Sequence, residues 1–237
     1  MLGHQRPQTT NSWSFALIGS PRAPCFFPEV RGCVRCLLED AQEGVETMAL
    51  RGHWMVPHVS ICHKHNTSLL PLWREGNRIR RYDSAPQLAL LAPKVLAGEM
   101  EVGSRKALPF ELWVESRLNG HTNPKNWLDQ HAFHAAANFC RYLGAARLRL
   151  ENIPLARVKP KHRPALCEMG FHVARRGVAA IQETLEELQS QPGTPQDGGK
   201  AIYPLMYERL AYDHRNDPAY APFQKILRDH MAATWAR

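Results

Sequence analysis

The sequence predicts a mainly α-helical protein in which a small zinc-ribbon or zinc-knuckle β module precedes a helical domain. Two observations support this fold class. Paired metal-ligand residues occur at Cys33 and Cys36 and again at Cys62 and His65, and beyond about residue 82 apolar side chains recur at helical spacing. The chain is therefore expected to divide into three regions. These are a poorly ordered segment over residues 1–30, a zinc-binding module over residues 31–82, and a domain of about five helices over residues 83–237.

The two pairs have the spacing of a structural zinc site. Two ligands separated by two residues can bind one zinc ion from a tight turn, and two such turns complete a tetrahedron. The 25 residues between the pairs contain β-like runs at residues 45–50 and 54–61, which would bring the second pair back beside the first. His63 is an alternative to His65, but only His65 repeats the two-residue spacing. The predicted Zn²⁺ ligands are Cys33, Cys36, Cys62 and His65.

The ion is expected to be needed for folding of the module. Three thiolates and one neutral imidazole around Zn²⁺ leave a charge of about −1, which Arg31, Arg35 and Lys64 would offset. Metal binding contributes on the order of 10 kcal/mol of folding free energy in comparable peptides. Because residues 31–73 contain few large apolar side chains, we expect this region not to fold without the metal.

The helices are predicted from their ends and their apolar stripes. Asn123 followed by Pro124 has the pattern of a helix start, and that helix is expected to end at Gly144. The remaining expected elements are a helix over residues 164–188, a loop over residues 191–199, a short helix over residues 203–210 and a last helix that begins at Asp217.

The other cysteines and the paired histidines are predicted to be structural. Cys140 and Cys167 lie in apolar helical stripes and are expected to be small core residues. Cys25 stays open as a further ligand candidate. His131 and His134 are three residues apart, but no acidic residue stands beside them, so a half-exposed helical pair is expected.

No motif of the common enzyme classes is present. The sequence lacks the His-Glu-x-x-His of zinc proteases, the His-x-Glu of zinc deaminases, Gly-x-Ser-x-Gly, and the glycine-rich phosphate and dinucleotide loops. We therefore predict no catalytic residues and no enzyme activity. A zinc hydrolase with an unfamiliar site is the alternative, and a closed four-ligand site would exclude it.

The charge balance favours a nucleic-acid partner. The 30 Lys and Arg residues exceed the 22 Asp and Glu residues, which gives a net charge of +8 and a pI near 9.4. Such a chain is attracted to phosphate backbones. Residues 141–163, which contain Pro154 and Pro160 and are followed by Pro164, are read as an extended basic connector between helices; a solvated basic loop is the alternative. The DNA-contact candidates are Arg141, Arg147, Arg149, Arg157, Lys159, Lys161 and Arg163.

The sequence contains no membrane or secretion signal that we can recognise. No segment reaches about 18 consecutive apolar residues, and the first 20 residues lack the apolar core of a signal peptide. Six cysteines in such a chain indicate metal ligands or free thiols rather than disulfides. We expect a cytoplasmic protein with no membrane partner.

Two stretches resemble the TniQ family of transposition proteins. The first is RGCVRCLLED at residues 31–40, followed by Trp54 and by ICHKHNTSLL at residues 61–70. The family commonly shows Arg-x-Cys-Pro-x-Cys-Leu-x-Glu-Asp, a tryptophan, and Cys-Pro-x-His-Gly-x-x-Leu-Leu. The second stretch, residues 207–235, resembles the helical part of family members.

The resemblance implies a non-catalytic, DNA-associated adaptor. Family members choose or recognise target DNA and recruit the AAA+ ATPase of the transposon, and some are carried by an RNA-guided targeting complex. The expected partners are therefore DNA and an AAA+ transposition ATPase, with an RNA-guided complex and a second copy of the chain left open. The alternative is a zinc-stabilised protein-interaction module without nucleic-acid binding.

Three features depart from the family pattern. Val34 and His63 occupy positions where proline is usual, and Asn66 replaces the glycine after the histidine. Residues 69–75 contain no cysteine, so the second zinc ion of many relatives is not expected. The helical segments that usually flank the module are short, which is the pattern of a truncated member.

Overall fold

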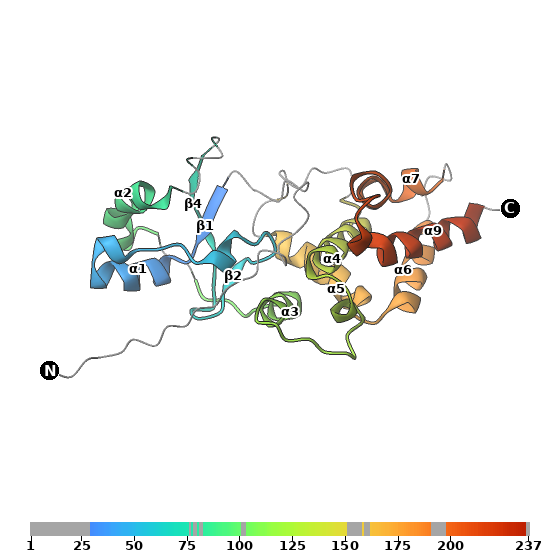
Figure 1. The fold of residues 1–237 in the computed structure, drawn as a ribbon, viewed down its shortest axis with the longest axis horizontal. Coiled ribbons are helices and arrows are strands. Elements are labelled where there is room, and N and C mark those ends of the chain that lie inside the picture. The colour runs from blue at the N-terminus through green and yellow to red at the C-terminus, as the bar shows by residue number, and fades with distance from the viewer. Residues whose placement is uncertain are drawn as a thin grey trace.

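The fold is mostly helical, with short strands gathered near the N-terminal end of the described chain, as predicted (Figure 1). In this computed structural model the described residues are 29–75, 77, 80, 83–100, 103–150, 158, 162–190 and 198–235. The segment predicted to be poorly ordered, residues 1–30, lies outside these ranges except for its last two residues. None of the described helices combines the length and the apolar character needed to span a membrane.

The region predicted to bind zinc, the zinc module, is built from two small antiparallel sheets and one helix. β1 pairs with β4, with Glu29 opposite Arg74, and β2 pairs with β3, with Cys62 opposite Thr67. The elements are β1 (Glu29–Gly32), α1 (Val34–Glu43), the 3-10 turns η2 (Val45–Thr47) and η3 (Gly52–Met55), β2 (Ile61–Cys62), β3 (Thr67–Ser68) and β4 (Leu70–Arg74).

The prediction of two strands between the ligand pairs is wrong, because α1, η2 and η3 occupy most of that region. The backbone there bonds to side chains instead of a partner strand. The Asp40 carboxylate accepts a hydrogen bond from the Ala49 amide at 3.3 Å and from Arg51 at 2.7 Å. The Thr47 hydroxyl donates to the Asp40 carbonyl at 2.6 Å. These bonds satisfy the polar groups that a sheet would otherwise pair.

Eight α-helices follow residue 83 in the described part of the chain, where about five were expected. They are α2 (Ser84–Leu96), α3 (Pro109–Leu118), α4 (Phe133–Arg147), α5 (Arg163–Ala174), α6 (Val178–Ser190), α7 (Gly199–Ile202), α8 (Pro204–Tyr207) and α9 (Ala221–Trp235). Shorter turns are the 3-10 segments η5 (Trp127–Gln130) and η9 (Pro218–Tyr220) and the π-helical η8 (Glu208–Asp213).

Three of the predicted helices differ from those in the structure, and the predicted start of the last one agrees with it. The long helix over residues 164–188 is two helices, because Gly177 adopts φ +102 between α5 and α6, a conformation that ends a helix. The helix expected from Asn123 begins only at Phe133, and the residues before it form η5. The short helix over residues 203–210 is divided between α8 and η8. Asp217 caps η9 by accepting from the Ala219 amide, so the predicted start of the last helical segment is confirmed.

Gly144 is a packing residue rather than a helix end. It lies inside α4, and a Cβ there would stand 1.8 Å from the Leu166 carbonyl oxygen of α5. Gly170 has the same relation to the Cys140 carbonyl oxygen, also at 1.8 Å. The two helices therefore approach so closely that neither position has room for a side chain. Cys140 and Cys167 are buried beside this crossing, as predicted for core residues.

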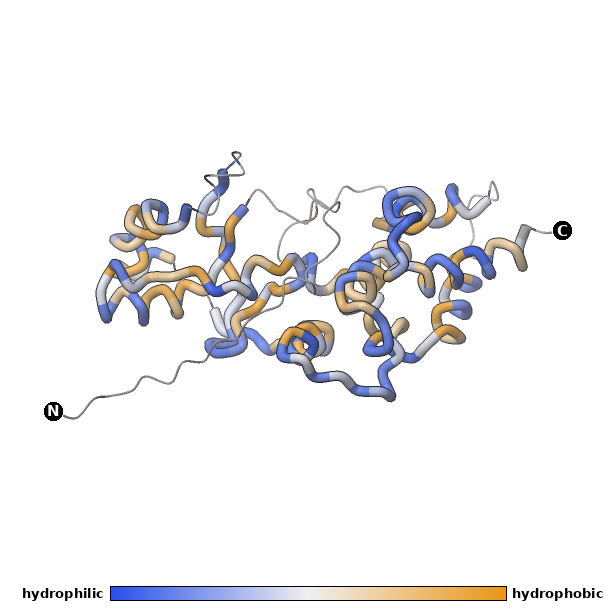
Figure 2. Tube along the Cα trace, viewed as in Figure 1, coloured by the Kyte–Doolittle hydropathy of each residue, from blue (hydrophilic) through white to orange (hydrophobic). Residues whose placement is uncertain are grey.

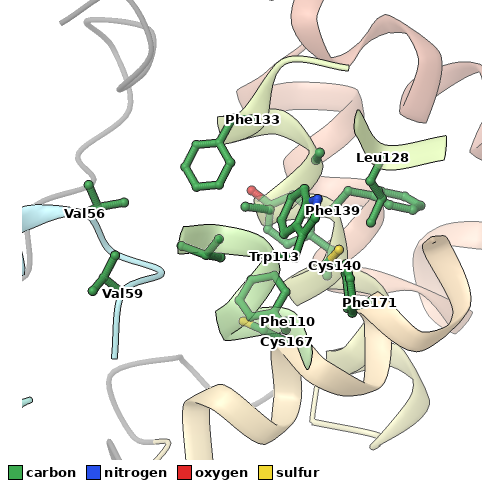
Figure 3. Close-up of a cluster of buried hydrophobic side chains, with 14 of the residues drawn as sticks. Val56, Val59, Phe110, Trp113, Leu128, Phe133, Phe139, Cys140, Cys167 and Phe171 are labelled. Carbon is green, nitrogen blue, oxygen red and sulfur yellow. The ribbon is translucent and has the colours of Figure 1, made fainter. Parts of the chain in front are cut away.

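α3 joins the zinc module to the helices. Its Phe110 and Trp113 pack against Phe171 of α5 and Phe133 of α4, while Val56 and Val59 of the zinc module face the same cluster (Figure 3). Seen end-on, α3 carries both hydrophobic and hydrophilic residues around its turn (Figure 2). One hydrophobic core therefore extends from the zinc module into the helices. The predicted division into two domains near residue 82 stays a prediction.

Gly144→Ala and Gly170→Ala are each expected to lower the free energy of unfolding by about 3 kcal/mol, because the added methyl group forces two backbones apart. Urea unfolding followed by circular dichroism measures this. Gly103→Ala is the control, since a Cβ at Gly103 meets nothing within 4 Å. Equal stability of the Gly103→Ala and Gly144→Ala proteins would contradict the close crossing.

Candidate metal centre

The two predicted ligand pairs converge at one point in the structure. The ligand atoms of Cys33, Cys36, Cys62 and His65 all lie within 4.8 Å of one another. The distances between these atoms are close to those between the ligands of a tetrahedral zinc ion. In such a site two sulfurs are about 3.8 Å apart, and a sulfur and a nitrogen are about 3.6 Å apart. The Cys36 and Cys62 sulfurs are 3.7 Å apart, and the three Sγ to Nδ1 distances are 3.4, 3.3 and 3.7 Å.

Each ligand has a local structural reason for its position. Cys33 is the N-cap of α1 and Cys36 lies in its first turn, where the positive end of the helix dipole favours thiolates. Cys62 ends β2, and His65 lies in the turn before β3. Asn66 completes that turn with φ +51, a left-handed conformation that asparagine tolerates better than most residues. This explains why asparagine can replace glycine here.

His65 is oriented by a carboxylate from α1. Its Nδ1 faces the sulfurs, and its Nε2 lies 3.0 Å from Glu39 Oε1. With Nδ1 on a metal, Nε2 carries the proton and donates to Glu39, the arrangement that fixes metal-bound histidines in many proteins. Lys64 donates to the other Glu39 oxygen at 2.5 Å. The Thr67 hydroxyl lies 3.4 Å from the Cys33 sulfur and can donate to a thiolate.

The three thiols influence one another strongly. Hydrogen bonds from Cys36 and Cys62 hold the pKa of Cys33 far below its ordinary range. The hydrogen bond with Cys33 raises the pKa of both Cys36 and Cys62, and burial raises them further. Ionisation of one sulfur therefore disfavours ionisation of the other two, and three thiolates together require a positive ion between them. The donor set of three soft sulfurs and one imidazole fits Zn²⁺.

The alternative ligands lie elsewhere. His63 Nδ1 is 2.9 Å from Glu115 of α3, so it points away from the sulfur cluster. His131 precedes α4 and packs its ring 4.4 Å from the ring of Trp127, while His134 packs against the Tyr220 ring. Within the described residues, the Cys33 cluster is the one group of side chains arranged to hold a metal. Cys25 lies outside the described residues.

The structure places four of the seven basic DNA-contact candidates. Arg141 and Arg147 belong to α4, so the expected extended connector is helical at its start. Arg149 follows α4 with φ +54, and Arg163 opens α5. Because Gly144 touches Leu166, the end of α4 lies beside the start of α5. Arg157, Lys159 and Lys161 lie outside the described residues.

A buried carboxylate that fixes the module to α3 was not predicted. Glu111 is 2% exposed, and its two oxygens accept hydrogen bonds from Arg105 at 2.5 and 2.7 Å. It also accepts from the Ser60 hydroxyl before β2 and from the Leu108 amide at 2.9 Å. Burial alone would raise the pKa of Glu111, but these donors outweigh it and lower the pKa. The only sequence signal is a glutamate three residues after a helix start.

Comparison with known families matches residues 2–69 to TniQ. This match covers less than a third of the chain and includes all four ligand candidates. Neither the curated proteins nor the solved structures contain a match. The resemblance predicted from the cysteine and histidine runs is thereby confirmed for this part of the chain.

We expect the purified protein to contain about one zinc ion per chain, and Cys62→Ser to lose it, because a hydroxyl is a poor substitute for a thiolate ligand. Elemental analysis and protease resistance of the zinc module measure the loss. Cys167→Ala is the matched control, since it removes a buried thiol outside the cluster and should retain the ion. Metal-free wild-type protein that resists proteolysis would refute the site.

Glu111→Gln is expected to lower the free energy of unfolding by about 2–3 kcal/mol at neutral pH, because Arg105 loses its charged partner. The folded-state pKa of Glu111 is depressed, so its contribution is present above its ordinary range and is lost as pH falls below about 4.3. The two proteins should therefore converge in stability on acidification. Chemical unfolding from pH 7 to pH 3 tests this, and a constant difference would contradict it.

Proposed function

We propose that this protein, whose residues 2–69 match TniQ, is a non-catalytic, DNA-associated adaptor in DNA transposition. The observation that carries the proposal is the coincidence of the family match with the four converging ligands. In this proposal Zn²⁺, held by Cys33, Cys36, Cys62 and His65, has a structural role. It stabilises the turns that present the surface of the module, and it takes no part in a reaction.

The geometry of the cluster supports a structural rather than a catalytic metal. Four protein ligands complete a tetrahedron, so no position remains for a water molecule or a substrate. Glu39, the carboxylate that contacts a ligand of the cluster, is hydrogen-bonded to His65 Nε2 and to Lys64. It therefore stands behind the imidazole, where it orients a ligand, rather than beside an open metal position.

DNA contacts are assigned to the corner where α4 ends and α5 begins. Arg147 and Arg149 lie at the end of α4, and Arg163 begins α5 beside them. Arg157, Lys159 and Lys161 belong to the segment that joins these two ends. The sequence of this corner has an excess of positive charge, which would bind phosphates without reading bases. Arg141 lies further into α4, with its guanidinium 5.1 Å from the Tyr142 ring centre.

The same proposal includes recruitment of an AAA+ transposition ATPase and a contribution to target-site selection. Both come from the family and not from a surface of this chain. An RNA-guided targeting complex and a second copy of the chain are further proposed partners. A protein-interaction module without DNA binding is the second candidate, and the cleft between the zinc module and α3 favours it.

The double variant Arg147→Gln with Arg149→Asn is expected to weaken binding to duplex DNA and to reduce the slope of log affinity against log salt by about 2, since each phosphate contact contributes about 0.9. Asparagine suits the positive φ of Arg149. Fluorescence anisotropy at several salt concentrations measures both quantities.

The charge-matched control is Arg175→Gln with Arg176→Gln, at the opposite end of α5, where both residues are exposed. This control should leave the slope nearly unchanged. Equal losses in the two double variants would remove the assignment to the α4–α5 corner. Absence of binding by the wild type at low salt would reject DNA association and favour the protein-interaction module.

A further inference from the structure

We propose that the cleft between the zinc module and α3 binds an extended polypeptide segment that carries apolar side chains and at least one Lys or Arg. This goes beyond the adaptor function, because it assigns a protein-docking site to residues separate from the basic corner. The cleft has a volume of about 640 Å³, which suits a few residues of a chain rather than a folded domain.

The two walls of the cleft supply the apolar contacts. Residues 50–54 and 58–64 of the zinc module form one wall. The other wall is formed by α3 and the residue after it, through Glu111, Val114, Glu115, Leu118 and Asn119. Leu50 and Leu118 are half-buried and face the cleft from opposite walls. Val59 and Val114 lie deeper and are buried. A side chain that enters between the walls would therefore meet carbon on both sides, which favours burial of an apolar group.

A buried indole supplies an unused hydrogen-bond donor. Trp54 lines the cleft and is 1% exposed, and its Nε1 has no acceptor among the described residues. The Cε3–Cζ3 edge of its ring packs on Gly32, where a Cβ would stand 3.1 Å from both atoms. The nitrogen is on the opposite edge of the ring, away from β1. An unpaired buried donor costs about 1–3 kcal/mol. Because the nitrogen itself is covered, a docked segment has to shift the side chains over it before a backbone carbonyl can accept its hydrogen.

The charges of the cleft favour a basic segment over an acidic one. The two cations of the zinc-module wall are each held by a carboxylate of α1: Arg51 contacts Asp40 at 2.7 Å and Lys64 contacts Glu39 at 2.5 Å. On the α3 wall, Glu115 is 41% exposed and meets His63. Among the described residues, Glu115 is therefore paired with the imidazole of His63 and not with a lysine or arginine. A Lys or Arg of the docked segment would complete that pairing.

The same arrangement disfavours DNA as the occupant. Phosphates are attracted to cations that lack carboxylate partners, whereas Arg51 and Lys64 are already paired. An extended polypeptide offers both of the groups that the cleft can use, namely a carbonyl for the indole and a long basic side chain for Glu115. We therefore assign the cleft to a protein partner and the α4–α5 corner to DNA.

The test uses the full chain and two end-blocked octapeptides, one alternating leucine with lysine and the other alternating leucine with glutamate. Nuclear magnetic resonance follows the indole N–H signal of Trp54, which is assigned with Trp54→Phe. The lysine peptide should shift this signal in a saturable manner, and the glutamate peptide should not. Leu118→Lys should weaken binding of the lysine peptide about tenfold, the loss of roughly one buried apolar side chain.

Leu112→Lys is the matched control, because Leu112 is an exposed leucine of α3 that does not line the cleft. It adds the same charge and should change the affinity less than about twofold. Glu115→Gln keeps the shape of the side chain and should weaken the lysine peptide about threefold. If Leu118→Lys unfolds, this second variant still decides the question. Binding of duplex DNA should be unaffected by all three variants.

Several outcomes would overturn the proposal. They are no shift of the Trp54 signal with either peptide, equal shifts with both peptides, equal weakening by Leu112→Lys and Leu118→Lys, or a shift of the Trp54 signal on adding a 12-base-pair duplex. The readout is separate from the anisotropy assay, so failure of the cleft leaves the proposal for DNA binding intact. Failure of DNA binding likewise leaves the docking proposal standing.

Discussion

The constraint on which the N-terminal half of the structure depends is the convergence of three cysteine sulfurs and one histidine nitrogen on one point. These atoms lie within 4.8 Å of one another, and three thiolates at that separation repel one another unless a positive ion stands between them. The four ligands come from the start of α1 and from the turn between β2 and β3. A single ion would therefore fix a helix, a small sheet and the connection between them, in a region that has short strands.

Two further contacts carry this local order into the rest of the chain. Glu111 of α3 accepts hydrogen bonds from Arg105 and from Ser60 of the zinc module, so the first turn of α3 is tied to β2. Beyond α3, the close approach at Gly144 and Gly170 holds α4 against α5. The position of the basic corner relative to the metal cluster follows from these two contacts, because α3 packs on α5 through Phe110 and Phe171.

Charge is distributed unevenly over this framework. In the zinc module Arg51 and Lys64 are held by carboxylates of α1, whereas the sequence from Arg141 to Arg163 is strongly basic. The proposed adaptor would contact DNA and a protein at the same time, and would therefore need two surfaces of different character. The basic corner would supply one of them, and the apolar cleft beside α3, where the cations are already paired, would supply the other.

The sequence by itself predicted the four side chains that converge in the structure, the mainly helical class and the match of residues 2–69 to TniQ, because ligand spacing, helical periodicity and the cysteine–histidine runs are local patterns. It did not determine the 3-10 turns between the ligand pairs. These turns depend on hydrogen bonds that Arg51 and the Ala49 amide donate to the Asp40 carboxylate, and those bonds form only in the folded chain. It also misassigned Gly144 as a helix end, because the need for glycine comes from the carbonyl of Leu166 on another helix. The choice of His65 over His63 rested on spacing, and the tertiary structure supplied the physical reason: α1 offers Glu39 to one imidazole, and α3 offers Glu115 to the other.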